Sequence, residues 1–172
     1  MAGLSVGNGL DQGVNQGPLI DGKAVARMHA QVADAVAKGG RLALGGKAHA
    51  LGGNFFEPTV IAHATPAMAF AKEEIFGPLA PVFAFETEAE AVTMANDTEY
   101  GLAAYLYTRD IGRAMRVSGA LEYGMVGVNE SLISCAEAPF GGVKESGVGR
   151  EGSRYGMDEY SVMKYTCLGG LA

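Results

Sequence analysis

The chain has 172 residues, which fits one domain and is enough to bury a substantial hydrophobic core. Its formal net charge is -6, from 13 basic and 19 acidic residues without a basic cluster, which argues against binding to nucleic acid or to an anionic membrane surface. No apolar run approaches the roughly 18 residues of a membrane-spanning helix, and the two cysteines make neither a disulfide framework nor a zinc site. We therefore expect a cytoplasmic protein that binds no metal.

Helix-like and strand-like patterns alternate almost throughout the chain. Asp21 precedes an amphipathic stretch that stops at Gly39-Gly40, which predicts a first helix with a start and a stop signal. Thr87 and Glu90 form a capping-box pattern that predicts a second helix, ending near residue 96, and Asp110 opens a third. The predicted strands are 41–44, 56–61, 81–85, 103–108 and 124–129.

This alternation with short turns predicts an α/β fold, in which right-handed crossovers build a three-layer, mainly parallel sheet covered on both faces. Pro58 lacks the N–H that a ladder needs, so the strand at 56–61 is expected at an edge. Residues 160–167 have strand propensity but follow a glycine-punctuated stretch. We therefore expect residues 1–158 to form the sheet domain and residues 159–172 to leave it as an arm strand.

Glu74 and Phe76 lie in a loop that precedes the strand at 81–85. In open α/β sheets, ligands bind in the crevice at the ends of strands. A carboxylate there can accept hydrogen bonds from two vicinal ribose hydroxyls, and a neighbouring aromatic ring can pack under a flat ring. On the local residues alone, a solvated glutamate beside a core phenylalanine in a Gly-Pro turn is the favoured alternative.

A second loop contains Ser134 and Phe140. The serine hydroxyl can donate a hydrogen bond to a substrate carboxylate, and the phenylalanine can wall an apolar pocket. An ordinary loop serine is the alternative. Leu102 opens the strand at 103–108, where a core leucine is the simplest interpretation.

Two further patterns suggest chemistry that their surroundings do not support. Gly147-x-Gly149-x-x-Gly152 matches a dinucleotide-binding fingerprint but does not follow a strand, so we interpret it as a tight loop entering a helix at 151–155. Cys135 lacks the cationic neighbour or paired base that activates a nucleophilic thiol. Cys167 lies in an apolar segment, where we expect it to pack as a small residue.

Four segments, taken in order and at compatible spacing, resemble the aldehyde dehydrogenase family over nearly the whole chain. They are residues 6–20, Phe56-Glu57-Pro58-Thr59-Val60, Lys72-Glu73-Glu74-Ile75-Phe76-Gly77-Pro78 and Ala138-Pro139-Phe140-Gly141-Gly142-Val143-Lys144-Glu145-Ser146-Gly147. In that family the nucleophilic cysteine, the general-base glutamate and the dinucleotide fold all precede these segments. The resemblance therefore implies a C-terminal fragment, with residues 1–158 as part of the catalytic domain and 159–172 as an oligomerisation arm.

The resemblance also implies roles for single residues. Glu74 and Phe76 match the family positions that contact the nicotinamide ribose, and Leu102 matches a position near the nicotinamide end of the cofactor. Ser134 stands where enzymes acting on succinic semialdehyde hold the distal carboxylate, with Phe140 beside it. The run at 149–156 is also most similar to the succinate-semialdehyde dehydrogenases.

The expected function is that of a fragment of an NAD- or NADP-dependent dehydrogenase, whose parent enzyme oxidises an aldehyde to a carboxylate. We expect the isolated chain to be inactive and to bind no cofactor, with another copy or the missing part of the enzyme as its partner. Two alternatives stay open. One is a non-enzymatic oligomerisation or interaction module derived from this fold, and the other is a free-standing nucleotide-binding domain.

Overall fold

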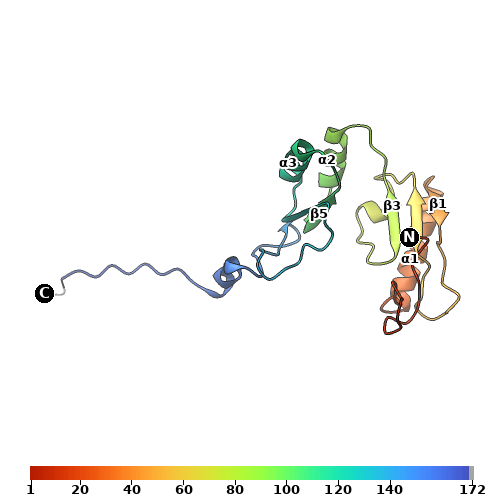
Figure 1. Cartoon of the computed structure of the whole chain (residues 1–172), viewed down its shortest axis with the longest axis horizontal. Coiled ribbons are helices and arrows are strands. Elements are labelled where there is room, and N and C mark those ends of the chain that lie inside the picture. The colour runs from red at the N-terminus through yellow and green to blue at the C-terminus, as the bar shows by residue number, and fades with distance from the viewer. Residues whose placement is uncertain (171–172) are drawn as a thin grey trace. The chain divides into compact units, whose positions relative to one another are not determined.

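The computed structural model of the protein describes residues 1–170 (Figure 1). The chain divides into two compact units, Met1–Phe85 (unit 1) and Glu86–Ala172 (unit 2). Unit 1 contains α1 (Gly22–Ala37), β1 (Arg41–Leu44), β2 (Thr59–Ala62), the 3-10 helix η1 (Ala69–Ala71) and β3 (Leu79–Val82). Unit 2 contains α2 (Glu88–Asn96), β4 (Tyr100–Gly101), β5 (Ala103–Leu106), α3 (Ile111–Ala120), β6 (Met125–Val128), β7 (Val143–Lys144) and the 3-10 helix η2 (Arg154–Tyr160).

Helix α1 forms where the sequence predicts it. The carboxylate of Asp21 accepts a hydrogen bond from Ala24 N at 2.7 Å, which satisfies one of the free donors at the helix start. Beyond Lys38, Gly39 adopts φ 89°, a left-handed conformation that costs glycine little, and the helix ends there. The apolar stripe faces the interior of unit 1, where Ala24, Met28, Val32 and Ala35 are buried.

The sheet of unit 1 has the order β1-β2-β3, with β2 antiparallel to β1 and parallel to β3. The expected edge position of 56–61 is therefore wrong. Because β2 begins only at Thr59, the missing N–H of Pro58 interrupts no ladder. The edge strands are instead β1 and β3. Of these, β3 contains Pro81 and starts at residue 79, ahead of the predicted 81–85.

One hydrophobic core packs α1 against this sheet. Burial of each large apolar side chain stabilises the fold by about 1.5–3 kcal/mol, so this core dominates the stability of unit 1. The apolar run 81–85 indicates a buried strand, but Val82 at the end of β3 and Phe85 beyond it are 51% and 60% exposed, so burial is wrong at these two positions. The buried members of the core are Met28, Val32, Ala35, Phe56, Ile61, Ala64, Met68, Phe70 and Leu79.

The helices of unit 2 begin at the predicted caps. Thr87 Oγ1 accepts from Glu90 N at 3.1 Å, and Asp110 Oδ1 accepts from Arg113 N at 3.1 Å. In a capping box the glutamate accepts a hydrogen bond from the N–H of the cap residue, which is Thr87 here. In this structure Glu90 Oε2 accepts instead from Glu86 N, one residue earlier, at 2.8 Å. Polar side chains thus set both helix starts from short-range sequence, which is why they are predictable.

The α/β fold is confirmed, but the single three-layer, mainly parallel sheet is wrong. The described strands form three small sheets, in which β2–β3 and β5–β6 are parallel and β1–β2 and β4–β7 are antiparallel. Helix α3 supplies the crossover between β5 and β6, as parallel pairing requires. Between β1 and β2 there is only a loop, and a direct loop connection returns the chain antiparallel.

The end of unit 2 contains no strand within the described residues. Helix η2 occupies 154–160, and residues 161–170 have no assigned secondary structure and are exposed. The strand expected at 160–167 is therefore not formed here, since a strand needs a partner for its N–H and C=O groups. Cys167 is exposed, so its predicted packing is wrong. Residues 171–172 of the predicted arm lie outside the described residues, and the arm itself stays a prediction.

Within residues 1–170, none of the helices combines the length and the apolar character that crossing a bilayer requires.

Candidate functional site

The Glu74 loop connects η1 to β3 in unit 1 and presents two predicted site residues to solvent. The carboxylate of Glu74 is exposed, and the ring of Phe76 is 76% exposed with a backbone φ of 41°. Ile75, between them, packs against the core of unit 1 instead. The alternative of a core phenylalanine at position 76 is therefore wrong, because alternation along the loop turns residue 75 inward.

Helix α1 fixes the start of this loop through one carboxylate. Asp34 Oδ2 accepts a hydrogen bond from Ala69 N, the first residue of η1, at 2.7 Å, and Asp34 Oδ1 contacts Lys38 Nζ at 2.6 Å. The hydrogen bond from Lys38, followed by that from Ala69, lowers the pKa of Asp34 below its ordinary value. Ala69 O then accepts from Glu73 N at 2.9 Å, so the anchor reaches the residue before Glu74.

The end of the loop rests on α1 as well. A Cβ at Gly77 would overlap Sδ of Met28, a buried residue of the core, so the close approach of loop and helix requires glycine at this position. Arg27 Nη2 donates to Phe76 O at 3.5 Å, a long hydrogen bond at the same end. The loop thus contacts α1 on both sides of Glu74.

This arrangement fits one end of a dinucleotide. An exposed carboxylate with no described hydrogen bond can accept from two ribose hydroxyls, and an exposed ring two residues away can pack against a planar group. The Gly147–Gly152 loop does not fit a dinucleotide, because the two-residue antiparallel strand β7 precedes it and no βαβ unit surrounds it.

In unit 2 a small cavity of about 230 Å³ brings three predicted site residues together. Leu102, Ser134 and Phe140 all line it, although they are up to 38 positions apart in the sequence. Its other lining residues are Ala103, Tyr105, Met125, Ser131, Leu132 and Ile133. The walls are thus apolar except for two serine hydroxyls and a tyrosine, which suits a small ligand with one polar end.

The loop that presents the serines is held by Glu130, directly after β6. Glu130 Oε1 accepts from Ser131 N at 2.8 Å and from Leu132 N at 2.9 Å. These backbone hydrogen bonds, that from Leu132 first, lower the pKa of Glu130. Asn129, with φ 56°, precedes it and exchanges two hydrogen bonds of 2.8 Å with the backbone of Thr108. Side chain to backbone bonds therefore shape this wall of the cavity.

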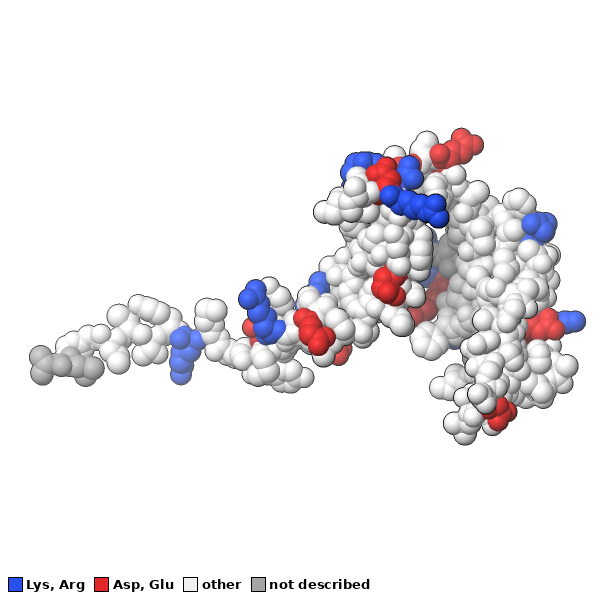
Figure 2. Space-filling view, in the orientation of Figure 1, with Lys and Arg blue, Asp and Glu red and all other residues white. Residues whose placement is uncertain are grey.

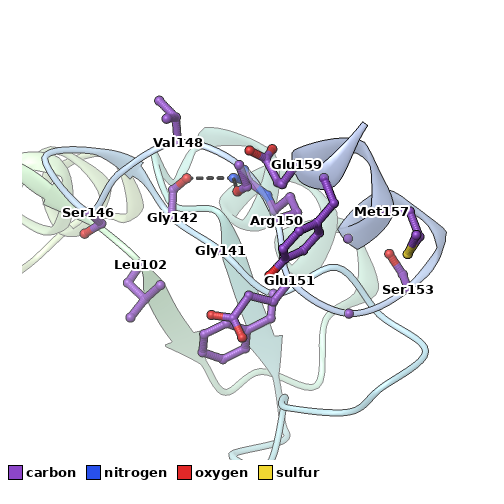
Figure 3. A pocket seen from close by; sticks show the side chains of 15 residues that line it. Leu102, Gly141, Gly142, Ser146, Val148, Arg150, Glu151, Ser153, Met157 and Glu159 are labelled. Carbon is purple, nitrogen blue, oxygen red and sulfur yellow. Dashed lines mark hydrogen bonds between the residues drawn. The ribbon is translucent and has the colours of Figure 1, made fainter. Parts of the chain in front are cut away.

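A larger cavity of about 620 Å³ lies between the Phe140 loop and η2 (Figure 3). Arg150 Nη1 donates to Gly142 O at 2.8 Å and to Gly149 O at 2.6 Å, which ties the two sides of this loop together. The backbones of Phe140 and Glu151 exchange hydrogen bonds of 2.9 and 2.7 Å beside it. Leu102 and Phe140 line both cavities.

The charged residues outside these cavities form ordinary surface networks. Figure 2 shows acidic and basic side chains gathered over α2 and α3. There Glu88 accepts from Arg113 Nε at 3.1 Å and from Arg116 Nε at 3.0 Å, which lowers the pKa of Glu88, mainly through Arg116. Such exposed pairs contribute little to stability. Among the described residues no cluster of metal-ligating side chains is found.

The sequence did not point to Ser131, Glu130 or Arg150. The repeat of serine at positions 131 and 134 is the signal that marks the first of them. The other two act through backbone carbonyl and N–H groups, which leave no trace in a residue pattern.

The family follows from comparison with known proteins. A model of the aldehyde dehydrogenase family matches residues 1–166. The chain belongs to the aldehyde dehydrogenase family. It is 57% identical over 171 residues to glutarate-semialdehyde dehydrogenase of Pseudomonas aeruginosa and 58% identical over 168 residues to succinate semialdehyde dehydrogenase of Acinetobacter baylyi. These alignments cover 99% and 98% of this chain, and 35% of each relative.

Two solved structures agree with this assignment. The chain is 60% identical to succinate-semialdehyde dehydrogenase from Burkholderia pseudomallei, with a TM-score of 0.94 over 97% of this chain and 35% of that one. It is 55% identical to an NADP-dependent enzyme of E. coli, with a TM-score of 0.95 over 98% of this chain and 35% of that one. The chain thus spans about a third of the length of the relatives that it matches.

Proposed function

We propose that this chain is the C-terminal third of an NAD- or NADP-dependent semialdehyde dehydrogenase and supplies one wall of its substrate pocket. The parent reaction is the oxidation of a short ω-carboxy aldehyde to the dicarboxylate. The convergence of Leu102, Ser134 and Phe140 on one small cavity is the observation that carries this proposal. The C-terminal placement rests on the order of the four segments that resemble the family.

The residues divide the work between two ends of the substrate complex. Ser134 Oγ donates a hydrogen bond to the distal carboxylate, and Phe140 packs against the alkyl chain, so that the aldehyde end is oriented. Glu74 accepts hydrogen bonds from the ribose hydroxyls, and Phe76 and Leu102 contact the nicotinamide end. NAD or NADP, when bound, accepts the hydride that the aldehyde loses on oxidation.

The isolated chain is inactive in this proposal. Positioning a substrate without a nucleophile and a base does not break the C–H bond, because catalysis belongs to the whole constellation. Cys135 is an exposed cysteine of the loop before Phe140, and the proposal gives it no catalytic role. The two unpaired cysteines agree with a reducing cytoplasm.

An exchange experiment tests the proposal. The matched 171-residue segment of the Pseudomonas aeruginosa enzyme is replaced by this chain, and reduced cofactor is measured with succinic and glutaric semialdehydes. We expect turnover that the isolated chain lacks. The control for placement is a second exchange, in which this chain replaces a segment of equal length at the N-terminal end of the relative. Turnover by that control alone, or by the isolated chain, contradicts the proposal.

The exchanged enzyme also tests the role of Ser134. A hydrogen bond to a charged group contributes about 1.5–3 kcal/mol, so Ser134→Ala should raise KM for a carboxylated aldehyde by roughly 10- to 100-fold. An uncarboxylated aldehyde of equal length should lose little. Ser118→Ala is the control, since that hydroxyl donates to Met115 O within α3. Equal losses for both aldehydes would contradict carboxylate binding by Ser134.

A second proposed role, interaction through the end of the chain, has an observation of its own. Val162, Met163 and Tyr165 are 94%, 99% and 88% exposed on a segment with free backbone hydrogen-bonding groups. Such a segment can add as a strand to a sheet edge of another copy. Sedimentation of the whole chain and of residues 1–160 tests this. Self-association that the shorter chain keeps would contradict it.

A further inference from the structure

One buried amide of unit 1 has no hydrogen-bond partner. Gln31, in the middle of α1, is 2% exposed, and neither its Oε1 nor its Nε2 has a partner among the described residues. A buried polar group without a partner destabilises a fold, so such groups are rare in folded proteins and often mark a functional position. The amide offers an acceptor and two donors to any group that approaches it.

The neighbours of Gln31 along α1 show which segment it faces. Side chains three and four positions apart lie on one face of a helix, so Arg27, Gln31 and Asp34 form a row. Arg27 Nη2 donates to Phe76 O at 3.5 Å. Asp34 Oδ2 accepts from Ala69 N at 2.7 Å. The row thus runs under the loop between η1 and β3, and Gln31 lies beneath the middle of that loop.

The middle of the Glu74 loop has backbone groups that can meet this amide. No hydrogen bond described for residues 1–170 includes the N–H groups of Glu74 and Ile75 or the C=O group of Glu74. The side chain of Ile75 packs against the core that α1 lines. Phe76 follows with φ 41°, a left-handed conformation that is strained for an aromatic residue. Unpaired polar groups on both sides and a strained residue beside them indicate a loop that can take a second arrangement.

We propose that Gln31 is a positioning residue for Glu74. This inference rests on the proposed function, in which the Glu74 carboxylate accepts hydrogen bonds from the ribose hydroxyls of the cofactor. When NAD or NADP binds, the loop moves against α1 and its backbone at Glu74 and Ile75 pairs with the amide of Gln31. Oε1 accepts from an N–H, and Nε2 donates to a C=O. Because these bonds form only in the bound arrangement, they strengthen cofactor binding and leave the amide unpaired in the free chain.

The first test measures the stability of the 172-residue chain. Gln31→Met keeps the size of the side chain and removes both unpaired polar atoms, so the free energy of unfolding of unit 1 should stay the same or rise. Thr59→Val is the control, because Thr59 is fully buried and its Oγ1 donates to Glu57 O at 2.7 Å and accepts from Gly46 N at 2.8 Å. This variant should lose stability.

Hydrogen exchange of the α1 amides, recorded at increasing urea concentration, compares the two variants. A loss in Gln31→Met as large as that in Thr59→Val overturns the inference, since Gln31 would then have a partner in the free chain already.

The second test follows the loop in the exchanged enzyme. Saturating cofactor should slow hydrogen exchange of a peptide covering residues 72–77 by roughly 5- to 10-fold, and Gln31→Met should abolish this slowing. The same variant should raise KM for the cofactor by roughly 5- to 10-fold and keep kcat at saturating cofactor. Val36→Met is the matched control, because Val36 lies on α1 outside the row and is 49% exposed. It should change none of these values.

The outcomes separate the inference from the proposed function. Cofactor that slows the loop equally in Gln31→Met and in the unsubstituted enzyme overturns the role of Gln31 and leaves the proposed function standing. A loss of kcat with unchanged KM in Gln31→Met overturns that role as well, since positioning of Glu74 acts on cofactor binding. An exchanged enzyme without turnover overturns the proposed function, and the inference fails with it.

Discussion

The two units hold their candidate site residues by different means. In unit 1 the Glu74 loop lies against α1, whose Met28 is fully buried in a core of nine apolar side chains. In unit 2, Ala114 is the one buried apolar side chain among the described residues, and Tyr105, Ile111 and Met115 on β5 and α3 are 49%, 78% and 68% exposed. The cavity walls of unit 2 are held instead by hydrogen bonds that the side chains of Glu130, Asn129 and Arg150 make with backbone groups.

This difference separates two kinds of sensitivity. Apolar burial is cooperative and nearly independent of pH, whereas bonds from exposed polar groups are individually weak and respond to protonation. Substitutions in the core should therefore disturb the Glu74 loop, and changes in the polar contacts should disturb the small cavity of unit 2.

The largest expected effect is on the core of unit 1. Phe56 is fully buried and its ring contacts that of His29 with centroids 5.0 Å apart, so Phe56→Ala should destabilise unit 1 by about 3–5 kcal/mol. Hydrogen exchange of the α1 amides at increasing urea concentration measures the free energy of unfolding of unit 1. The matched change in unit 2, Ile111→Ala, should stay within about 0.5 kcal/mol. Similar losses for both variants would remove the contrast between the units.

A smaller effect is expected where the loop meets the core. Gly77→Ala places a methyl group against Met28 and should cost about 1–3 kcal/mol through overpacking. The Met28→Ala variant opens space there. Adding Gly77→Ala to Met28→Ala should therefore cost less stability than adding it to the unsubstituted chain. A double-variant cycle measures the coupling, and full additivity would show that loop and helix do not touch.

In unit 2, Asn96 tests the hydrogen-bonded contacts. Its Nδ2 donates to Ala120 O and its Oδ1 accepts from Glu122 N, both at 2.9 Å, which ties the ends of α2 and α3 together. Asn96→Ala should destabilise unit 2 by about 1 kcal/mol. Exchange of the Glu122 amide should rise more than exchange in α1. Asn54→Ala in unit 1 is the control, and unchanged Glu122 exchange would contradict the prediction.

The smallest effects are pH-dependent and sharpen the comparison. Asp34 and Glu130 have pKa values below their ordinary 3.8 and 4.5, so both carboxylates favour the folded state at neutral pH. This contribution is lost as pH falls through the lowered pKa values. Amide signals of Ala69 should follow Asp34, and those of Ser131 and Leu132 should follow Glu130. Asp34→Asn and Glu130→Gln should abolish these titrations, and midpoints above the ordinary values would contradict the assignment.

What the sequence predicts correctly is local. Asp21, Thr87 and Asp110 cap helices within three residues of themselves, so their patterns are read without the fold. The central place of β2 depends on partners far along the chain, such as Leu42 for Ile61, 19 positions away, and Leu79 for Thr59, 20 positions away. No local pattern carries that information. Pro58 suggested an edge because the exact start of a strand is the least predictable part of it.

The site divides in the same way. Ser134 and Phe140 were named from a resemblance, and their meeting with Leu102 in one cavity follows from the pairing of β5 with β6. The larger cavity could not be predicted, because it is formed by η2 and the Gly147–Gly152 loop, which meet only in the folded chain.

The division of the chain at Phe85 also decides what optical spectroscopy can see. The protein has no tryptophan, and all 7 tyrosines follow position 99, in unit 2. Intrinsic fluorescence therefore reports only on the unit with the sparse core. The 16 residues of α1 contribute nothing to that signal, although they carry much of the far-ultraviolet circular dichroism. A fluorescence melt that ends early, beside a dichroism melt that continues, would record two units unfolding in sequence.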